Sequence, residues 1–333
     1  RSPPKCRMIL WGVSMVRNEV DIVEAFVRHN LSILDGLLVI DHGSADTTLD
    51  ILTALCRERL PLVVMKNDAV GYMQQAVMTQ AVRHAFASTR ADFVFPLDAD
   101  EFVKAVSRTE LERALAAVPA DAHGLLSWPT YVPDLRRPAA DILAALRGAR
   151  RAVGEARGLT KAVVARRFLQ ATDEVLSSGN HWVQAHPDAK VRGMRRHALV
   201  TDRVAAVAHV PIRSVDQFIA KVAIKKLGRI AANIDWKPDA ASQVAYEALR
   251  AGMPVDVDAL EHAALNWSVA RGSWREAGAV TLVDDPFLAP IALRYTPPAA
   301  ADPLPLALSA VERLVRRLAT PRAPAPVAAG TPR

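Results

Sequence analysis

The fold-determining segment of this chain is Asp92-Phe93-Val94-Phe95-Pro96-Leu97-Asp98-Ala99-Asp100-Glu101, in which an apolar strand runs directly into three acidic side chains. Residues two apart in extended backbone project to the same side, so we expect the carboxylates of Asp98 and Asp100 to face one point. Carboxylate oxygens are the ligands that Mg²⁺ and Mn²⁺ prefer. The alternative interpretation is an acidic turn that caps the next helix or is simply solvated.

Three more strands are predicted upstream of this segment, and helical segments separate the four. Short apolar runs predict the strands at 8–15, 37–40, 62–65 and 92–97. We expect Asn18 to cap the first helix. The predicted helix carries Val20, Val23, Phe26, Val27 and Leu31 on one face. The next helices start at Asp46 or Thr47 and span 73–87. Alternation of this kind predicts a parallel sheet with helices on both faces, and ligands bind at the carboxyl ends of such strands.

Polar side chains follow these strands at that edge: Arg17-Asn18-Glu19, Asp41, Lys66-Asn67-Asp68 and Asp98-Asp100. A strand-to-helix turn accounts for Gly43, Ser44 and Asp46. The turn does not account for Asp41, whose carboxylate could accept hydrogen bonds from a nucleobase N–H or a ribose hydroxyl. Arg17 and Glu19 have a function if they point into the cleft.

The rest of the chain predicts further strands at 124–128, 161–165 and 204–209, and a polar insertion at 136–157. Ser214 is expected to cap a helix, 239–275 is mostly helical, and a basic amphipathic helix spans 308–318. We therefore divide the chain into 1–230, with a nucleotide-binding half at 8–105 and an acceptor and metal half at 120–230, a helical extension at 231–299, and a Pro/Ala-rich tail at 300–333.

His209 ends an apolar strand, and Arg213 and a helix start follow within five residues. Because a helix N-terminus with nearby cations suits phosphate oxygens, Arg213 and Lys221 are candidate phosphate ligands. A neutral imidazole at His209 supplies a further metal ligand. His181, in Ser178-Gly179-Asn180-His181, is a second candidate. The alternative for either histidine is an ordinary buried or surface side chain.

The composition is that of a globular protein, with 51% hydrophobic and 23% charged residues. The net charge of +7 favours anionic partners. The two cysteines, Cys6 and Cys56, lack metal-ligand spacing and fit a reducing compartment, so a cytoplasmic location is the expectation. An aromatic content of 5% argues against single-stranded nucleic acid as a partner. The first residue is Arg rather than Met, so a preceding targeting segment is left open.

Taken in order, these motifs resemble the family 2 glycosyltransferases of the GT-A fold, in particular a bacterial branch. The resemblance is carried by Arg17-Asn18-Glu19, Asp41 through Thr47, Asp98 through Phe102, Gly179-Asn180-His181 and His209-x-Pro-x-Arg213-Ser214. It covers roughly residues 8–228. It implies a Rossmann-like mixed α/β sheet with helices on both faces, here followed by a helical C-terminal extension.

The resemblance also implies transfer of a sugar from a nucleoside diphosphate donor, with a UDP-sugar favoured, to a saccharide or lipid-linked acceptor, with inversion. It places the nucleotide base at Asp41, the ribose or a metal-bound water at Asp98, and Mn²⁺ or Mg²⁺ at Asp100 and His209. The predicted site is then as follows. The catalytic residues are Asp98, Asp100, Glu101 and His181, the donor ligands are Arg17, Glu19, Asp41, Lys66, Arg213 and Lys221, and the metal ligands are Asp98, Asp100 and His209.

The resemblance implies an acceptor-side carboxylate as general base, and Asp173, Glu174, Asp188 and Asp202 are unranked candidates. A sugar nucleotidyltransferase is an alternative, but it needs a Gly-rich phosphate loop, and residues 13–18 contain no glycine. A catalytically silent binding or scaffold protein is another. The basic helix at 308–318 is expected to pack on the domain, with contact to a membrane surface as the alternative.

Overall fold

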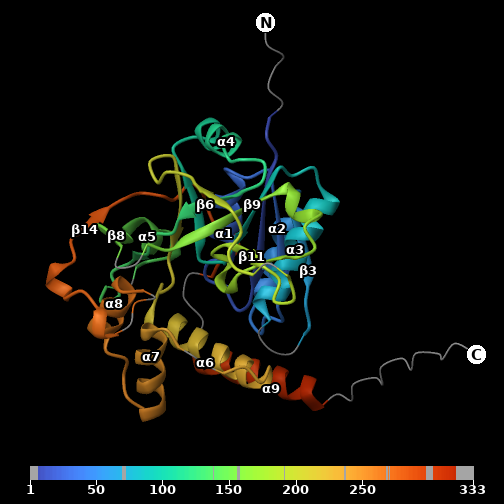
Figure 1. Cartoon of the computed structure of the whole chain (residues 1–333). Helices are drawn as coiled ribbons and strands as arrows, with labels where there is room; N and C mark the ends of the chain where they lie inside the picture. The colour runs from blue at the N-terminus through green and yellow to red at the C-terminus, as the bar shows by residue number, and fades with distance from the viewer. Residues whose placement is uncertain are drawn as a thin grey trace, which may run out of the picture.

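The structure is a computed structural model that describes residues 7–69, 73–137, 139–155, 158–190, 192–235, 238–267, 269, 271–297 and 303–319. Its centre is one large sheet with helices packed on it (Figure 1). Four parallel strands occur in the order β3 (Leu62–Lys66), β2 (Gly36–Asp41), β1 (Leu10–Val16) and β4 (Phe93–Leu97). All four lie where the apolar runs predict strands.

The sheet continues beyond β4 with mixed strand directions. In order, the strands are β9 (Thr160–Ala165), β6 (His123–Ser127), β13 (Ala205–His209) and β5 (Glu101–Ala105), and β12 (His197–Leu199) also pairs with β6. Since β9 is antiparallel to both β4 and β6, and β13 is parallel to β6, the carboxyl ends of β1, β2, β4, β6 and β13 lie at one edge. The predicted mixed α/β fold is confirmed.

Strand residues alternate between two apolar clusters because successive side chains point to opposite faces. Leu37 and Val39 of β2 belong to one cluster, whereas Leu38 and Ile40 belong to the other. The first cluster includes residues of α1 (Val23–Leu31), α2 (Thr48–Arg57) and α4 (Arg108–Ala116). The second is built on α3 (Gln74–Ser88). Helices therefore cover both faces of the sheet, as the sequence predicts.

Two smaller sheets and five further α-helices complete the described part of the chain. They are β10 (Glu174–Leu176) with β11 (Val183–Ala185), β14 (Leu282–Asp284) with β8 (Arg150–Ala152) and β7 (Tyr131–Val132), α5 (Ile142–Gly148), and then α6 (Val215–Ala231), α7 (Ala240–Ala251), α8 (Val257–Leu265) and α9 (Pro303–Ala319). Ser214 caps α6 as predicted. Helices α6, α7 and α8 share a third apolar cluster, and α9 lies along α6 (Figure 1). Among the described helices, none combines the length and the apolar content that crossing a membrane requires.

Two local predictions are wrong. Asn18 does not cap a helix, because α1 begins only at Val23, and the Asn18 side chain accepts the N–H of Ala45 at 2.6 Å. The backbone is not extended at Asp98-Ala99-Asp100 either. It forms a turn in which the N–H of Glu101 donates to the carbonyl oxygen of Asp98, and β5 starts at Glu101. The turn reverses the chain so that β5 pairs with β13 at the far side of the sheet.

Candidate active site

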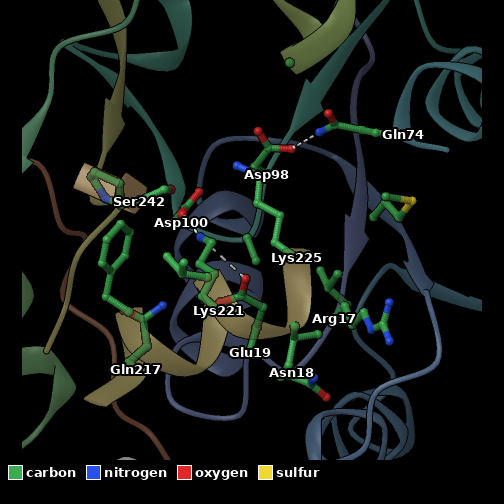
Figure 2. A pocket seen from close by; sticks show the side chains of 18 of the residues that line it. Arg17, Asn18, Glu19, Gln74, Asp98, Asp100, Gln217, Lys221, Lys225 and Ser242 are labelled. Carbon is green, nitrogen blue, oxygen red and sulfur yellow. Dashed lines mark hydrogen bonds and ion pairs between the residues drawn. The ribbon is translucent and has the colours of Figure 1, made fainter. Parts of the chain in front are cut away.

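A cavity of about 360 Å³ opens at the carboxyl edge of the sheet. Its walls come from the loops after β1, β2 and β4, from Trp128 after β6, from His209 at the end of β13, and from α6. Figure 2 shows how the charged groups face one another. The charged and imidazole side chains that line the cavity are Arg17, Glu19, Asp21, His42, Asp98, Asp100, Lys161, His181, His209, Lys221, Lys225, Arg229 and Asp239.

The turn after β4 sends its two aspartates to different cations, in contrast to the expectation that they face one point. Asp98 accepts hydrogen bonds from Gln74 at 2.7 Å and from Lys161 at 3.1 Å. Asp100 instead accepts from Lys221 at 2.5 Å (Figure 2). The divergence follows from the turn, because its carboxylates do not share the direction that extended backbone would give them.

Glu101 lies beneath this turn and is completely buried. Its carboxylate accepts the indole N–H of Trp128 at 2.7 Å and the N–H of Asp98 at 2.9 Å, and it pairs with Lys161 at 2.6 Å. Burial raises the pKa of Glu101 and the ammonium of Lys161 opposes that shift. These contacts shape the turn, and a part for Glu101 in the chemistry stays a prediction.

Asp100 is 4% exposed, and Lys221 bridges it to Glu19, which lies 3.8 Å from the ammonium. Burial alone raises the pKa of a carboxyl group. At Asp100 the nearby Lys221, His209 and Arg213 outweigh burial and hold the pKa well below its usual value. Asp100 is therefore ionised at neutral pH and offers full negative charge to the cavity.

Arg213 sits behind Glu19 rather than in the cavity lining. Its guanidinium donates to Glu19 and Asp21, each at 2.6 Å, and its side chain is 2% exposed. The contacts fix the loop after β1 against the start of α6. The predicted contact of Arg213 with phosphates stays a prediction.

A divalent cation would find suitable ligands at Asp100 and His209. One ligand atom each from Asp100, Glu101 and His209 lie within 4.8 Å of one another, and all three residues are buried. Three donors already hold Glu101, but Nδ1 of His209 is buried without a hydrogen-bond partner among the described residues. Burial also keeps the pKa of His209 well below its ordinary value, so the imidazole is neutral, as a ligand must be. The residues fit Mn²⁺ or Mg²⁺, whose remaining ligands are phosphate oxygens and water.

Two aromatic contacts fix the histidines of the cavity. Trp128 stacks on His209 with ring centroids 3.9 Å apart, and it meets His181 edge-on at 5.2 Å. Nδ1 of His181 lies 2.8 Å from the carbonyl oxygen of Thr160. Since a carbonyl can only accept, Nδ1 carries the hydrogen and Nε2 is the basic nitrogen. Gly179 lies beside Nε2, and its left-handed φ of 73° keeps a side chain from that space.

Besides Arg213, two predicted donor ligands lie outside the cavity lining. The carboxylate of Asp41 is 3.2 to 3.3 Å from the N–H groups of Gly43 and Ser44 and so closes the turn after β2. Lys66 is exposed at the end of β3, at the edge of the sheet. The roles proposed for both in nucleotide binding stay predictions.

Sequence reasoning missed several side chains that the cavity gathers. Lys161 is 1% exposed and joins Asp98 to Glu101, and its ammonium lies 5.4 Å from the centroid of Trp128. The acids raise its pKa against the effect of burial. A lysine inside the apolar run of β9 is the signal that identifies it in retrospect. Gln74, Lys225 and Asp239 carry no comparable signal.

The candidates for an acceptor-side carboxylate do not line the cavity. Asp173 pairs with Arg195 on the surface, and Glu174 is buried beside His123 and Arg167. Asp188 is 90% exposed. Asp202 is exposed in the loop before β13. The carboxylates that do line the cavity are Glu19, Asp21, Asp98, Asp100 and Asp239.

No protein-family model and no curated protein matches the chain. Among solved structures it is similar to TarS from S. aureus (residues 1–349), with 13% identity, coverage of 72% of this chain and 71% of that one, and a TM-score of 0.34. It is also similar to a mannosyltransferase from Pyrobaculum calidifontis in complex with GDP-Man and Mn²⁺, with 17% identity, coverage of 79% of this chain and 75% of that one, and a TM-score of 0.37. A third similar structure is glucosyl-3-phosphoglycerate synthase from Mycobacterium tuberculosis, in complex with Mn²⁺, UDP and glucosyl-3-phosphoglycerate. Here the identity is 16%, the coverage is 48% of this chain and 57% of that one, and the TM-score is 0.26. At TM-scores this low the likeness supports no conclusion about activity, so the function is inferred from the cavity.

Proposed function

We propose that this chain is a glycosyltransferase that transfers a sugar from a nucleoside diphosphate donor, with a UDP-sugar favoured, to an acceptor hydroxyl. The observation that carries the proposal is the meeting of Asp100, His209 and Lys221 in one cavity at the carboxyl edge of the sheet. They come from the turn after β4, from β13 and from α6, and each motif that resembles family 2 glycosyltransferases contributes residues to the same cavity. A scaffold protein has no need to bury so many charges at one edge, since each costs desolvation free energy.

Negative charge develops on the diphosphate as the bond to the sugar breaks, and the cavity holds groups that stabilise it. A divalent ion at Asp100 and His209 would supply positive charge against the phosphate oxygens. Lys221 and Lys225 line the cavity from one face of α6. Groups held in place before the reaction stabilise this charge without the cost of reorganisation.

Proton removal from the acceptor is assigned to His181. Its Nδ1–H is engaged by the carbonyl oxygen of Thr160, so Nε2 is the ring nitrogen that accepts a proton in this tautomer. His181 lines the same cavity as Asp98 and Asp100. Lys161 and Gln74 hold the carboxylate of Asp98 in place by hydrogen bonds. Inversion at the anomeric carbon remains a prediction of the resemblance.

Thermal unfolding tests the proposal directly. The full chain is titrated with Mn²⁺ and with UDP, GDP and ADP, and we expect a rise in melting temperature that requires both metal and one of the nucleotides. Asp100→Asn should remove the metal-dependent rise. Asp188→Asn should leave it intact, because this carboxylate is 90% exposed and away from the cavity. A wild-type chain whose melting temperature responds to no pairing of metal and nucleotide would contradict the proposal and favour the scaffold alternative.

A further inference from the structure

Helix α9 forms part of the cavity, although it belongs to the last described segment of the chain. It lies along α6, and Leu306 from its first turns lines the cavity (Figure 1). Ala310, one turn later, is 3% exposed. The side of α9 that carries Leu306 and Ala310 therefore faces the domain, whereas Leu304 and Leu308 are exposed.

Further along the helix, Arg317 reaches the loops that follow β2 and β3. Its guanidinium forms an ion pair with the carboxylate of Asp68 and donates to the carbonyl oxygen of Asp68 at 3.1 Å. A Cβ placed on Gly43 would lie 2.9 Å from Nη1 of Arg317. Arg317 thus lies against the loops that follow two neighbouring parallel strands.

Arg17 directly follows β1 and lines the cavity, and β1 pairs with β2 up to Asp41, next to the turn at Gly43 that Arg317 faces. Its Nε is buried and has no hydrogen-bond partner within the described part of the chain. Burial lowers the pKa of Arg17, and the positive charges of Arg317 and Arg313 lower it further. The carboxylate of Asp41 opposes this shift, while it also lies within 3.3 Å of two backbone N–H groups. Asp68 pairs with Arg317.

We propose that α9 is the outer wall of the donor site, and that Arg17 and Arg317 together bind the phosphates of the nucleoside diphosphate. This inference rests on the proposed function and adds a binding element from α9. Guanidinium groups suit the site because their donors match phosphate oxygens in pairs. An anion between Arg17 and Arg317 relieves their mutual repulsion and gives Nε of Arg17 an acceptor.

Isothermal titration calorimetry of the full chain tests the proposal, with UDP and GDP in the presence of Mn²⁺ as the probes. Arg317→Ala and Arg17→Ala should each weaken binding of the preferred nucleotide at least about tenfold, the effect of losing one charge-assisted hydrogen bond. Arg316→Ala is the matched control, since it removes the same charge from the next position of α9, where the side chain is exposed. Its affinity should stay within about twofold of wild type, as expected for a screened surface charge.

The outcomes separate the alternatives. Tighter binding by Arg317→Ala would mean that α9 excludes the nucleotide, and it would overturn the proposal. Equal affinities in wild type, Arg17→Ala and Arg317→Ala would also overturn it while leaving the transferase assignment standing. A wild-type chain without affinity for any nucleotide would contradict both this proposal and the proposed function.

Discussion

The indole of Trp128 lies stacked on the imidazole of His209, with ring planes inclined by 22°, while its N–H donates to the buried carboxylate of Glu101. One side chain thus connects a candidate metal ligand to the carboxylate that shapes the acidic turn. The arrangement restrains His209 without using a hydrogen bond to its ring. It also makes Trp128 a test of how far the geometry of the site depends on packing.

Trp128→Phe keeps an aromatic ring but removes the indole donor. We expect a loss of about 1–3 kcal/mol in the free energy of unfolding, because a buried oxygen of Glu101 loses a partner. Urea denaturation measures it. Trp182→Phe is the control, since its indole N–H also donates to a side chain, at 3.2 Å, but outside the acidic turn. An equal loss in both variants would mean that the hydrogen bond from Trp128 to Glu101 stabilises the fold no more than the hydrogen bond from Trp182 does.

Lys161→Met should destabilise the fold by about 3–5 kcal/mol, because it leaves Asp98 and Glu101 without the cation between them. Adding Glu101→Gln to the same chain should restore part of the loss, since one of the two unbalanced charges is then gone. Chemical denaturation of the single and double variants measures the coupling. If the double variant is as unstable as the sum of both single changes, Lys161 and Glu101 do not act as a pair.

His181→Gln should slow release of nucleoside diphosphate from the preferred sugar nucleotide by about 10²–10⁴-fold, the usual contribution of a positioned base. Affinity for the free nucleotide should change little, because the assigned role is in proton transfer. Steady-state kinetics and calorimetry give the two quantities. His186→Gln, at a half-exposed histidine, is the control. A loss of nucleotide affinity with an unchanged rate would assign His181 to binding instead.

Acid should destabilise the protein through His29. Burial lowers the pKa of His29 to about 4, and its ring nitrogens lie 2.9 Å from the carbonyl of Val103 and 3.0 Å from the N–H of Ala289. A depressed histidine pKa means that the unfolded chain binds the proton first, so stability is complete above about pH 6.5 and falls as the pH drops toward 4. We expect a loss of about 2 kcal/mol between pH 7 and pH 5 from this residue. Urea titrations of wild type and His29→Gln should show a flatter pH dependence in the variant, and an equal slope would exclude His29.

Gly43→Ala and Gly154→Ala form a matched pair, because both glycines have a left-handed φ, of 70° and 71°, and only Gly43 faces Arg317. Each substitution should cost about 1–2 kcal/mol of stability from backbone strain. Gly43→Ala should in addition displace Arg317 and weaken nucleotide binding, as calorimetry would show. Equal nucleotide affinities in the two variants would indicate that the contact between Gly43 and α9 has no part in binding.

The strands and helices of the first hundred residues could be predicted because apolar periodicity and burial agree there. Leu37 through Ile40 read as a buried strand and lie between two cores. Asn18 shows where local reasoning fails. Its side chain has the right chemistry for a cap, but a loop 27 residues later supplies the N–H that it accepts. Such a partner depends on tertiary structure and leaves no mark in the neighbouring sequence.

The acidic turn could be located from sequence, but its contacts could not. Asp98 is 63 residues from Lys161, and Asp100 is 121 residues from Lys221, so only the folded sheet brings them together. The position of α9 could not be predicted from the sequence either. Its apolar stripe predicts a buried face but does not say which surface covers it. Long-range pairs of this kind decide the site, and they arise from the strand order.

The lysines that join the acids of the cavity also bear on how the protein is assembled. Lys161 and Lys221 act as built-in counter-ions for Asp98, Glu101 and Asp100, so part of the negative charge of the acidic edge is offset during folding without a dissolved metal. Under the proposed function, chelators should therefore abolish catalysis while leaving the fold intact, and the supply of metal would regulate the rate of the reaction rather than the amount of folded protein.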